Sequence, residues 1–273
     1  MRLVPRDILV LITLNKLRVL DIETSYQLCG FTRYNKCAKR LALLEKNGYI
    51  KYEKFYGSVK KFYILTQKGM NVIYPREKRV TKNGDSYVYQ KKPPILKFTA
   101  ITHEMTVAKC LLHILKCDEN LSIGDFISDR ENQMNMSYYE KMKSIHFCDL
   151  LCEKYHTKIE IELSKKQLTR LEKNFLNNGD DYVQLWIVGS NVLYKRLVDL
   201  KNRFPTYTVK VFTLENFYNT QINLAEWEKE IIQNNSEMQK HQEHLEYLMK
   251  KKKSEQMSMY DDEFRENGLE VKK

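Results

Sequence analysis

The sequence lacks the short motifs that mark several common enzyme classes. It has only nine glycines in 273 residues and no glycine-rich phosphate-binding loop, and neither HExxH nor GxSxG occurs. These absences exclude the usual nucleotide-binding, zinc-protease and α/β-hydrolase sites. Carboxylates remain as the groups around which a catalytic site would be built.

Long apolar stretches are also missing. No run approaches the roughly 20 apolar residues of a membrane-spanning helix, and the N-terminus has no small-residue cleavage site. Its apolar positions are interrupted by Arg6, Asp7, Asn15 and Lys16, a pattern typical of an amphipathic helix. We therefore expect a soluble, cytoplasmic protein without a membrane partner.

Cysteine and histidine clusters typical of zinc sites are absent too. The six cysteines form no CxxC pair, so they predict buried, reduced thiols. His241 and His244 are spaced for one face of a helix, but no cysteine or third histidine lies nearby, which argues against a zinc site.

Acidic residues are scarce in the first part of the chain. Residues 1–100 contain 21 lysines and arginines against 7 aspartates and glutamates, a net charge of +14, whereas the remaining residues carry a net charge of −3. A basic module of this kind indicates a polyanionic partner. Nucleic acid is the first candidate. A membrane surface ranks below nucleic acid, because no basic helix here has the broad apolar face that membrane binding needs.

The first 75 residues predict a winged helix-turn-helix domain. Proline and capping residues mark helix starts, glycines mark helix ends, and Gly57-Ser58 separates two tyrosine-rich strands as in a hairpin. The predicted elements are helices at 5–16, 21–29 and 32–47, a hairpin at 49–65 (the wing) and a fourth helix from Thr66.

Basic residues gather where such a domain contacts DNA. Cys37, Leu41 and Leu44 would face the core and leave the N-terminal half of helix 32–47 free to enter the major groove. Lysines on the wing would contact phosphates. Ordinary solvated charges, or a surface that docks a protein, are the alternatives. The candidate DNA-binding residues are Arg33, Asn35, Lys36, Lys39 and Arg40 on the helix and Lys51, Lys54, Tyr56, Lys60 and Lys61 on the wing.

Three further regions follow the winged helix. Residues 76–98 predict a basic linker, residues 99–218 an α/β domain with helices on both faces of its sheet, and residues 219–273 a charged helix with a flexible tail. The last region would serve docking or self-association, a homodimer included. The elements expected in the second domain are a helix at 102–116, strands at 123–132, 145–153 and 157–163, a helix at 164–178, a central strand at 181–190, a helix at 191–204 and a strand at 207–214.

Carboxylates cluster in two neighbouring predicted strands. The segment KIEIELSKKQ (158–167) alternates strictly, with Ile159 and Ile161 on one face and Glu160 and Glu162 on the other. A short turn would bring Asp149, from the preceding strand, beside this pair. Either the acidic face is wet and the aspartate is held by a salt bridge, or the carboxylates hold a metal ion.

This arrangement is similar to the PD-(D/E)xK nuclease motif, in which Mg²⁺ or Mn²⁺ activates a water molecule against a phosphate. The match is imperfect, because Glu162 stands where the motif places a lysine, and Lys165 is the nearest substitute. A degenerate, inactive version is a further alternative. The candidate catalytic residues are Asp149, Glu160, Glu162 and Lys165, and the candidate metal ligands are Asp149, Glu160, Glu162 and Glu104, with Glu131 as an additional one.

Several stretches together carry a resemblance to one family. They are YILTQKG (63–69), THEMTVAKCLLHIL (102–115), Asp149 within HFCDLL, IEIEL (159–163) and YVQLWIVGS (182–190). Over roughly residues 5–215 the chain resembles the replication-relaxation proteins of plasmids and integrative elements, which join a winged helix to a diverged restriction-endonuclease-like domain. The resemblance implies a role in replication, DNA relaxation or conjugative transfer, beside a relaxase or a replication initiator.

Two hypotheses follow for the whole chain. In the first, a mobile-element protein binds double-stranded DNA through its winged helix and cuts or nicks it with a magnesium-dependent second domain. In the second, the protein is a non-enzymatic adaptor or transcriptional regulator that recruits a relaxase or an initiator.

Overall fold

The computed structural model describes residues 1–54, 60–80, 86–136, 146–164, 168–233 and 236. The chain forms two compact units, Met1–Glu228 and Lys229–Lys273. In the second unit residues 229–233 are helical, and most of the predicted C-terminal helix lies outside the described residues. None of the helices in the described ranges is long and apolar enough to cross a membrane.

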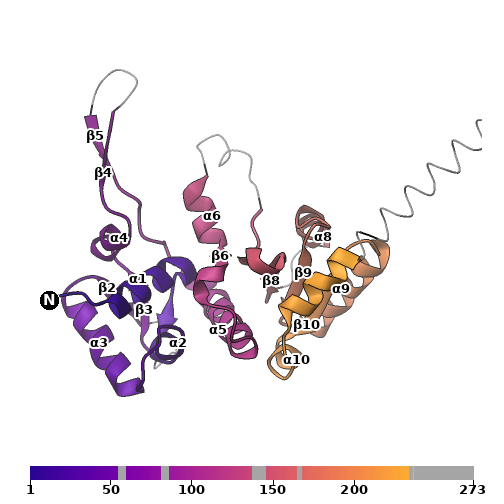
Figure 1. Cartoon of the computed structure of the whole chain (residues 1–273), viewed down its shortest axis with the longest axis horizontal. Helices are drawn as coiled ribbons and strands as arrows, with labels where there is room; N and C mark the ends of the chain where they lie inside the picture. Colours follow the sequence, from indigo (N-terminus) through magenta and orange to yellow (C-terminus); the bar gives the residue numbers. More distant parts are fainter. Residues whose placement is uncertain (55–59, 81–85, 137–145, 165–167, 234–235, 237–273) are drawn as a thin grey trace, which may run out of the picture. The chain divides into compact units, whose positions relative to one another are not determined.

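The N-terminal part has the predicted order of helices and hairpin strands, with one two-residue strand, β1, that was not predicted (Figure 1). Asp21 and Thr66 cap α2 and α4, because their side chains accept hydrogen bonds from the backbone N–H groups of Thr24 and Gly69. The strands pair antiparallel in the order β1-β3-β2. The elements are α1 (Pro5–Leu17), β1 (Leu20–Asp21), α2 (Ile22–Leu28), α3 (Tyr34–Lys46), β2 (Ile50–Glu53), β3 (Phe62–Leu65) and α4 (Gln67–Ile73).

Helix α3 is amphipathic, as its spacing predicts. Cys37, Leu41 and Leu44 are completely buried and pack it into the core of the N-terminal part. The opposite side faces solvent and carries polar residues together with the exposed Ala42 and Leu43. Burial of one face therefore fixes which side chains of α3 are presented outward.

A β-hairpin is present where only a linker was predicted. Strands β4 (Glu77–Val80) and β5 (Ser86–Tyr89) pair antiparallel, with Glu77 opposite Tyr89 and Val80 opposite Ser86. The Asn-Gly pair between them is a strong hairpin signal that the linker interpretation did not use. Residues 81–85 themselves lie outside the described residues.

The following part is mixed α/β, with a five-stranded sheet in the order β10-β9-β8-β7-β6. Strand β7 runs antiparallel to β6 and β8, whereas β8, β9 and β10 run parallel. All six residues of β9 are buried, which confirms its prediction as a central strand. The elements are α5 (Ile101–Cys117), β6 (Phe126–Ser128), α6 (Asp129–Asn135), β7 (Leu150–Cys152), β8 (Thr157–Glu162), α8 (Leu168–Asn177), β9 (Val183–Val188), α9 (Asn191–Arg203), β10 (Val209–Thr213) and α10 (Leu214–Tyr218).

Two predicted strands of this part are reduced to three residues each in the structure. The predicted strand 123–132 has only three strand residues, because Ser128 caps helix α6 and ends the strand. The Glu131 carboxylate completes the capping box by accepting a hydrogen bond from the Ser128 backbone N–H at 2.9 Å. Placing Glu131 on a strand was therefore wrong. The predicted strand 145–153 is reduced to β7, so that Asp149 lies just before it.

The N-terminal part packs against the α/β part within the first unit. Val19, Phe62 and Ile64 form one buried cluster with Ile101 and Met105 of α5. Polar contacts extend this junction. The Lys16 ammonium group, 5% exposed, donates to the Phe126 carbonyl and lies 3.1 Å from Glu131. The two predicted domains thus share an apolar and a charged interface.

Candidate functional site

The acidic cluster is organised around strand β8. Leu150 pairs with Ile159 across the antiparallel β7–β8 ladder, which brings the preceding Asp149 alongside Glu160, as the sequence predicts. The Asp149 carboxylate accepts the backbone N–H of Ile161 at 2.7 Å. The aspartate therefore extends the ladder by a side-chain hydrogen bond.

The acidic face of β8 is buried. Only 4% of Glu160 and 3% of Glu162 is exposed. These residues pair in register with Trp186 and Val188 of β9, which belong to the apolar core formed with α8 and α9. Of the two interpretations of the alternating segment, the wet strand face is therefore wrong.

Glu160 is held by two polar neighbours. Its Oε1 lies 2.5 Å from His146 Nε2 and accepts a hydrogen bond from the Asn178 amide at 3.2 Å. Burial raises the pKa of Glu160, and the charge of Asp149 adds to this effect, whereas His146 and Asn178 favour the carboxylate. Glu160 is thus a buried carboxylate whose charge depends on a histidine beside it.

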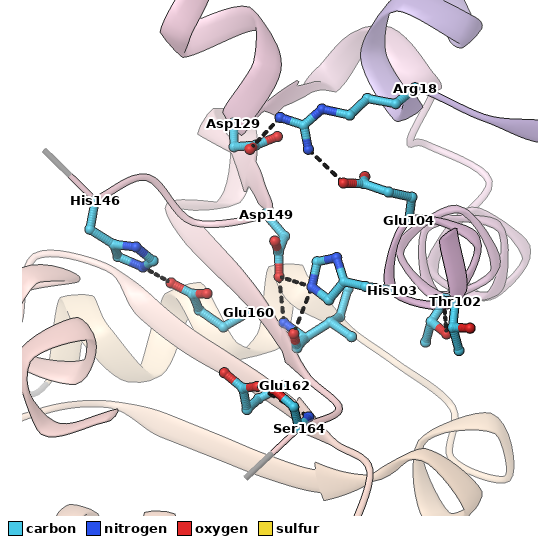
Figure 2. Close-up of polar contacts among 12 residues, drawn as sticks. Arg18, Thr102, His103, Glu104, Asp129, His146, Asp149, Glu160, Glu162 and Ser164 are labelled. Atoms are coloured by element: carbon cyan, nitrogen blue, oxygen red, sulfur yellow. Dashed lines mark hydrogen bonds and ion pairs between the residues drawn. The ribbon is translucent and has the colours of Figure 1, made fainter. Parts of the chain in front are cut away.

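Asp149 forms a second carboxylate–histidine pair. The His103 ring, on α5, places Nε2 at 3.5 Å from Asp149 and at 2.9 Å from the carbonyl oxygen of Ile161 (Figure 2). Burial opposes a charge on the ring, but the hydrogen-bonding and charge effects of Asp149, with smaller ones from Glu104, raise the pKa of His103 to about 9. At neutral pH the His103 ring therefore carries a positive charge beside Asp149.

The other predicted ligands have partners of their own. Glu162 Oε1 accepts hydrogen bonds from the Ser164 N–H and hydroxyl at 3.2 and 3.0 Å. Glu104 lies 2.7 Å from Arg18, whose other guanidinium nitrogen lies 2.7 Å from Asp129. Burial raises the pKa values of Glu104 and Asp129, and Arg18 opposes this rise.

The four predicted metal ligands do not converge. Figure 2 shows Asp149 directed toward His103, Glu160 toward His146 and Glu104 toward Arg18. Within the described ranges no three histidine, cysteine, aspartate or glutamate side chains are grouped as metal ligands. These residues, as they lie, do not fit one magnesium site. Lys165, the predicted catalytic lysine, lies outside the described residues.

His103 and His146 were missed by the sequence interpretation, which examined only the histidine pair near the C-terminus. Each lies close to a candidate carboxylate in the sequence, His103 beside Glu104 and His146 three residues before Asp149. That proximity was a usable signal. The pairing itself is long-range, because 46 positions separate His103 from its partner, and spacing alone does not show it.

The His103–Asp149 pair predicts a pH-dependent stability. Because folding raises the pKa of His103 from 6.5 to about 9, its contribution is complete below pH 6.5 and is lost as the pH rises through 9. The ring is 32% exposed, so after solvent screening we expect a loss of about 1–2 kcal/mol over this window. Urea unfolding at intervals between pH 6.5 and 9 measures it. The variant His103→Gln keeps a hydrogen-bond donor for the Ile161 carbonyl oxygen but cannot titrate. Its free energy of unfolding should fall less than that of the wild type between pH 6.5 and 9, by the same amount of about 1–2 kcal/mol. Parallel curves of unfolding free energy against pH for the two proteins would refute the pairing.

A second candidate site is the outer face of α3. Arg33, Asn35, Lys36 and Lys39 are all exposed, as predicted for DNA-contacting residues. Arg40 differs, because its guanidinium is bound to the buried carboxylate of Asp7, with Nε 2.6 Å from Oδ1. Arg40 therefore fastens α3 to α1.

The wing residues vary in their contacts. Lys54 is exposed, Lys51 lies 2.6 Å from Glu53, and the Lys61 ammonium lies 4.7 Å from the centre of the Tyr52 ring. Lys60 lies 3.8 Å from Asp21. Tyr56 lies outside the described residues. The described wing lysines thus add positive charge beside α3, partly offset by two carboxylates.

The exposed cations of α3 and the carboxylate–histidine pairs around β8 are the two polar constellations that the fold assembles from the predicted site residues. No family model matches the chain, and neither a curated protein nor a solved structure does.

Proposed function

We propose that this protein binds double-stranded DNA with the outer face of α3. The observation that carries the proposal is that Asn35, Lys36 and Lys39 are exposed on a helix whose other face is buried, with the exposed N-cap residue Arg33 directly before them. Arginine, lysine and asparagine are side chains that contact phosphates and base edges in the major groove. The helix before α3 and the hairpin after it match the order of a winged helix-turn-helix.

The charge distribution supports the same partner. The net charge of +14 lies within residues 1–100, which include α3 and the wing. Such a segregated positive charge steers a protein to nucleic acid and makes its affinity depend on salt. Protein docking through α3 is the alternative, and it would leave the affinity for DNA unaffected by changes on this face.

We further propose a role in the replication, relaxation or conjugative transfer of a mobile element, beside a relaxase or an initiator. The support is the resemblance described above and an α/β part that begins with helix α5, a three-strand meander and a parallel strand. The separate pairing of Asp149 and Glu160 favours an adaptor over a nuclease. Plasmid cleavage that needs Mg²⁺ or Mn²⁺ and is lost in Asp149→Ala would reverse that preference.

The test of DNA binding removes three cations from α3 and its N-cap. We expect Arg33→Gln, Lys36→Gln and Lys39→Gln together to weaken duplex binding roughly 100-fold at low salt and to lower the slope of log K against log salt by about 2–3. Fluorescence anisotropy with a labelled duplex of 40 base pairs, titrated at several salt concentrations, measures both quantities. Arg40 is left intact because its loss would disturb the contact with Asp7.

A matched variant controls for the change in net charge. Lys109→Gln, Lys195→Gln and Lys201→Gln remove three exposed cations from α5 and α9. We expect this protein to bind nearly as the wild type does. Equal affinities for the α3 variant, the control and the wild type would refute the proposed DNA-binding face.

A further inference from the structure

A second basic site lies where strand β5 ends and helix α6 begins. A cavity of about 260 Å³ is lined there mainly by polar and cationic side chains, with Met134 as an apolar member, and none of its lining residues is acidic. The residues that matter for its chemistry are Gln90, Lys91, Lys92, Arg130 and Gln133. None of them belongs to the α3 face or to the wing.

Arg130 is the central group of this cavity. One of its terminal nitrogens donates to the carbonyl oxygen of Lys92 at 2.5 Å, which orients the guanidinium. Its Nε is buried and has no hydrogen-bond partner among the described residues. A buried donor without an acceptor is costly, and a shift of the side chain that brings Nε to a ligand oxygen would relieve that cost.

The acidic neighbours of Arg130 are directed elsewhere. Asp129 is bound by Arg18, and Glu131 is bound by Lys16 and by the Ser128 N–H. Burial and the nearby charge of Arg18 lower the pKa of Arg130, although an arginine remains protonated at neutral pH. Within the described part of the chain, Arg130 forms no ion pair with a carboxylate.

Two lysines complete the positive surface. The Lys91 ammonium lies 4.3 Å from the centre of the Tyr74 ring, which holds the side chain in place by a cation–π contact. Lys92 is exposed beside it. A guanidinium with two ammonium groups and two amides is a donor set suited to a phosphate group.

We propose that this cavity binds a phosphate of the nucleic-acid backbone and thereby extends the DNA contact beyond α3. The proposal rests on the proposed DNA-binding function. The cavity is smaller than the roughly 300–1,000 Å³ of typical small-molecule sites, which favours one backbone phosphate over a whole nucleotide ligand. Phosphate contacts of this kind position a protein on DNA without reading its sequence.

The experiment compares Arg130→Gln and Lys92→Gln with the wild type in the same anisotropy titrations with the duplex of 40 base pairs. We expect Arg130→Gln to weaken binding roughly 10-fold and to lower the salt slope by about 0.9, as for one lost phosphate contact. Lys92→Gln changes an exposed side chain and should weaken binding roughly 3-fold. Circular dichroism confirms that each variant is folded.

The outcomes separate this inference from the proposed function. If Arg130→Gln and Lys92→Gln both keep the wild-type affinity for the duplex and the wild-type salt slope, the phosphate-binding inference is overturned, even where the α3 variant loses binding. Loss of binding in Arg130→Gln but not in the α3 variant supports the cavity and refutes the α3 face. A thermal shift with inorganic phosphate that Arg130→Gln abolishes, with DNA affinity unchanged, identifies free phosphate as the ligand and also overturns the inference.

Discussion

Replacing Arg18 with methionine is expected to lower the free energy of unfolding by about 3–5 kcal/mol at pH 7. Arg18 is 17% exposed and binds both Glu104 and Asp129, each at 2.7 Å. Methionine keeps much of the side-chain length but leaves two largely buried carboxylates without their cation. Urea unfolding at pH 7, followed by circular dichroism, measures the loss.

The pH dependence identifies the cause of this loss. Burial already raises the pKa values of Glu104 and Asp129, and removal of Arg18 raises them further, so the folded variant binds more protons than its unfolded state. The difference in unfolding free energy between the wild type and Arg18→Met should therefore become smaller as the pH falls from 7 toward 5. Adding Glu104→Gln and Asp129→Asn to the variant should recover part of the stability at pH 7.

A matched control exists on the surface of α9. Arg203 lies 3.1 Å from Glu172, but it is 52% exposed, so we expect Arg203→Met to cost less than about 1 kcal/mol. A loss in Arg18→Met no larger than this would show that the junction does not depend on the buried ion pairs.

Gly69→Ala is expected to destabilise the N-terminal part by about 3 kcal/mol or more. An added Cβ would lie 2.2 Å from the carbonyl oxygen of Tyr49 and 2.7 Å from a methyl carbon of Leu65. The oxygen has little freedom to move, because it accepts the N–H and the hydroxyl of Thr66 at 3.2 and 2.8 Å. Urea unfolding measures the loss, and hydrogen exchange should show weakened protection in α4.

Gly124 offers the comparison for this variant. A Cβ there would meet only the Ser122 hydroxyl, at 3.4 Å, so Gly124→Ala should change stability by less than about 1 kcal/mol. Similar values for the two glycine variants would contradict the steric explanation for Gly69.

The order of elements was accessible to prediction because local signals define it. The caps at Asp21 and Thr66 and the helical spacing of Cys37, Leu41 and Leu44 each depend on residues a few positions apart. The start of α6 was equally local. The sequence Ser-Asp-Arg-Glu at 128–131 is a capping box, and extending a strand through it overlooked that signal.

The burial of the acidic face of β8 could not be predicted from such local signals. Alternation assigns Glu160 and Glu162 to one face of β8 but does not reveal what covers that face. Their burial depends on the parallel pairing with β9 and on the helices packed over it. The contacts of Asp149 with His103 and of Glu104 with Arg18 likewise join residues distant in the sequence.

The junction between the two parts also constrains how the chain can be divided in evolution or in the laboratory. A fragment ending near residue 98 would expose Val19, Phe62 and Ile64, and the complementary fragment would expose Ile101 and Met105. Newly exposed apolar surface of this kind promotes aggregation. Recombination that exchanges the N-terminal part for that of an unrelated protein would therefore succeed only with compensating changes on α5, so the two halves are expected to be inherited as one unit.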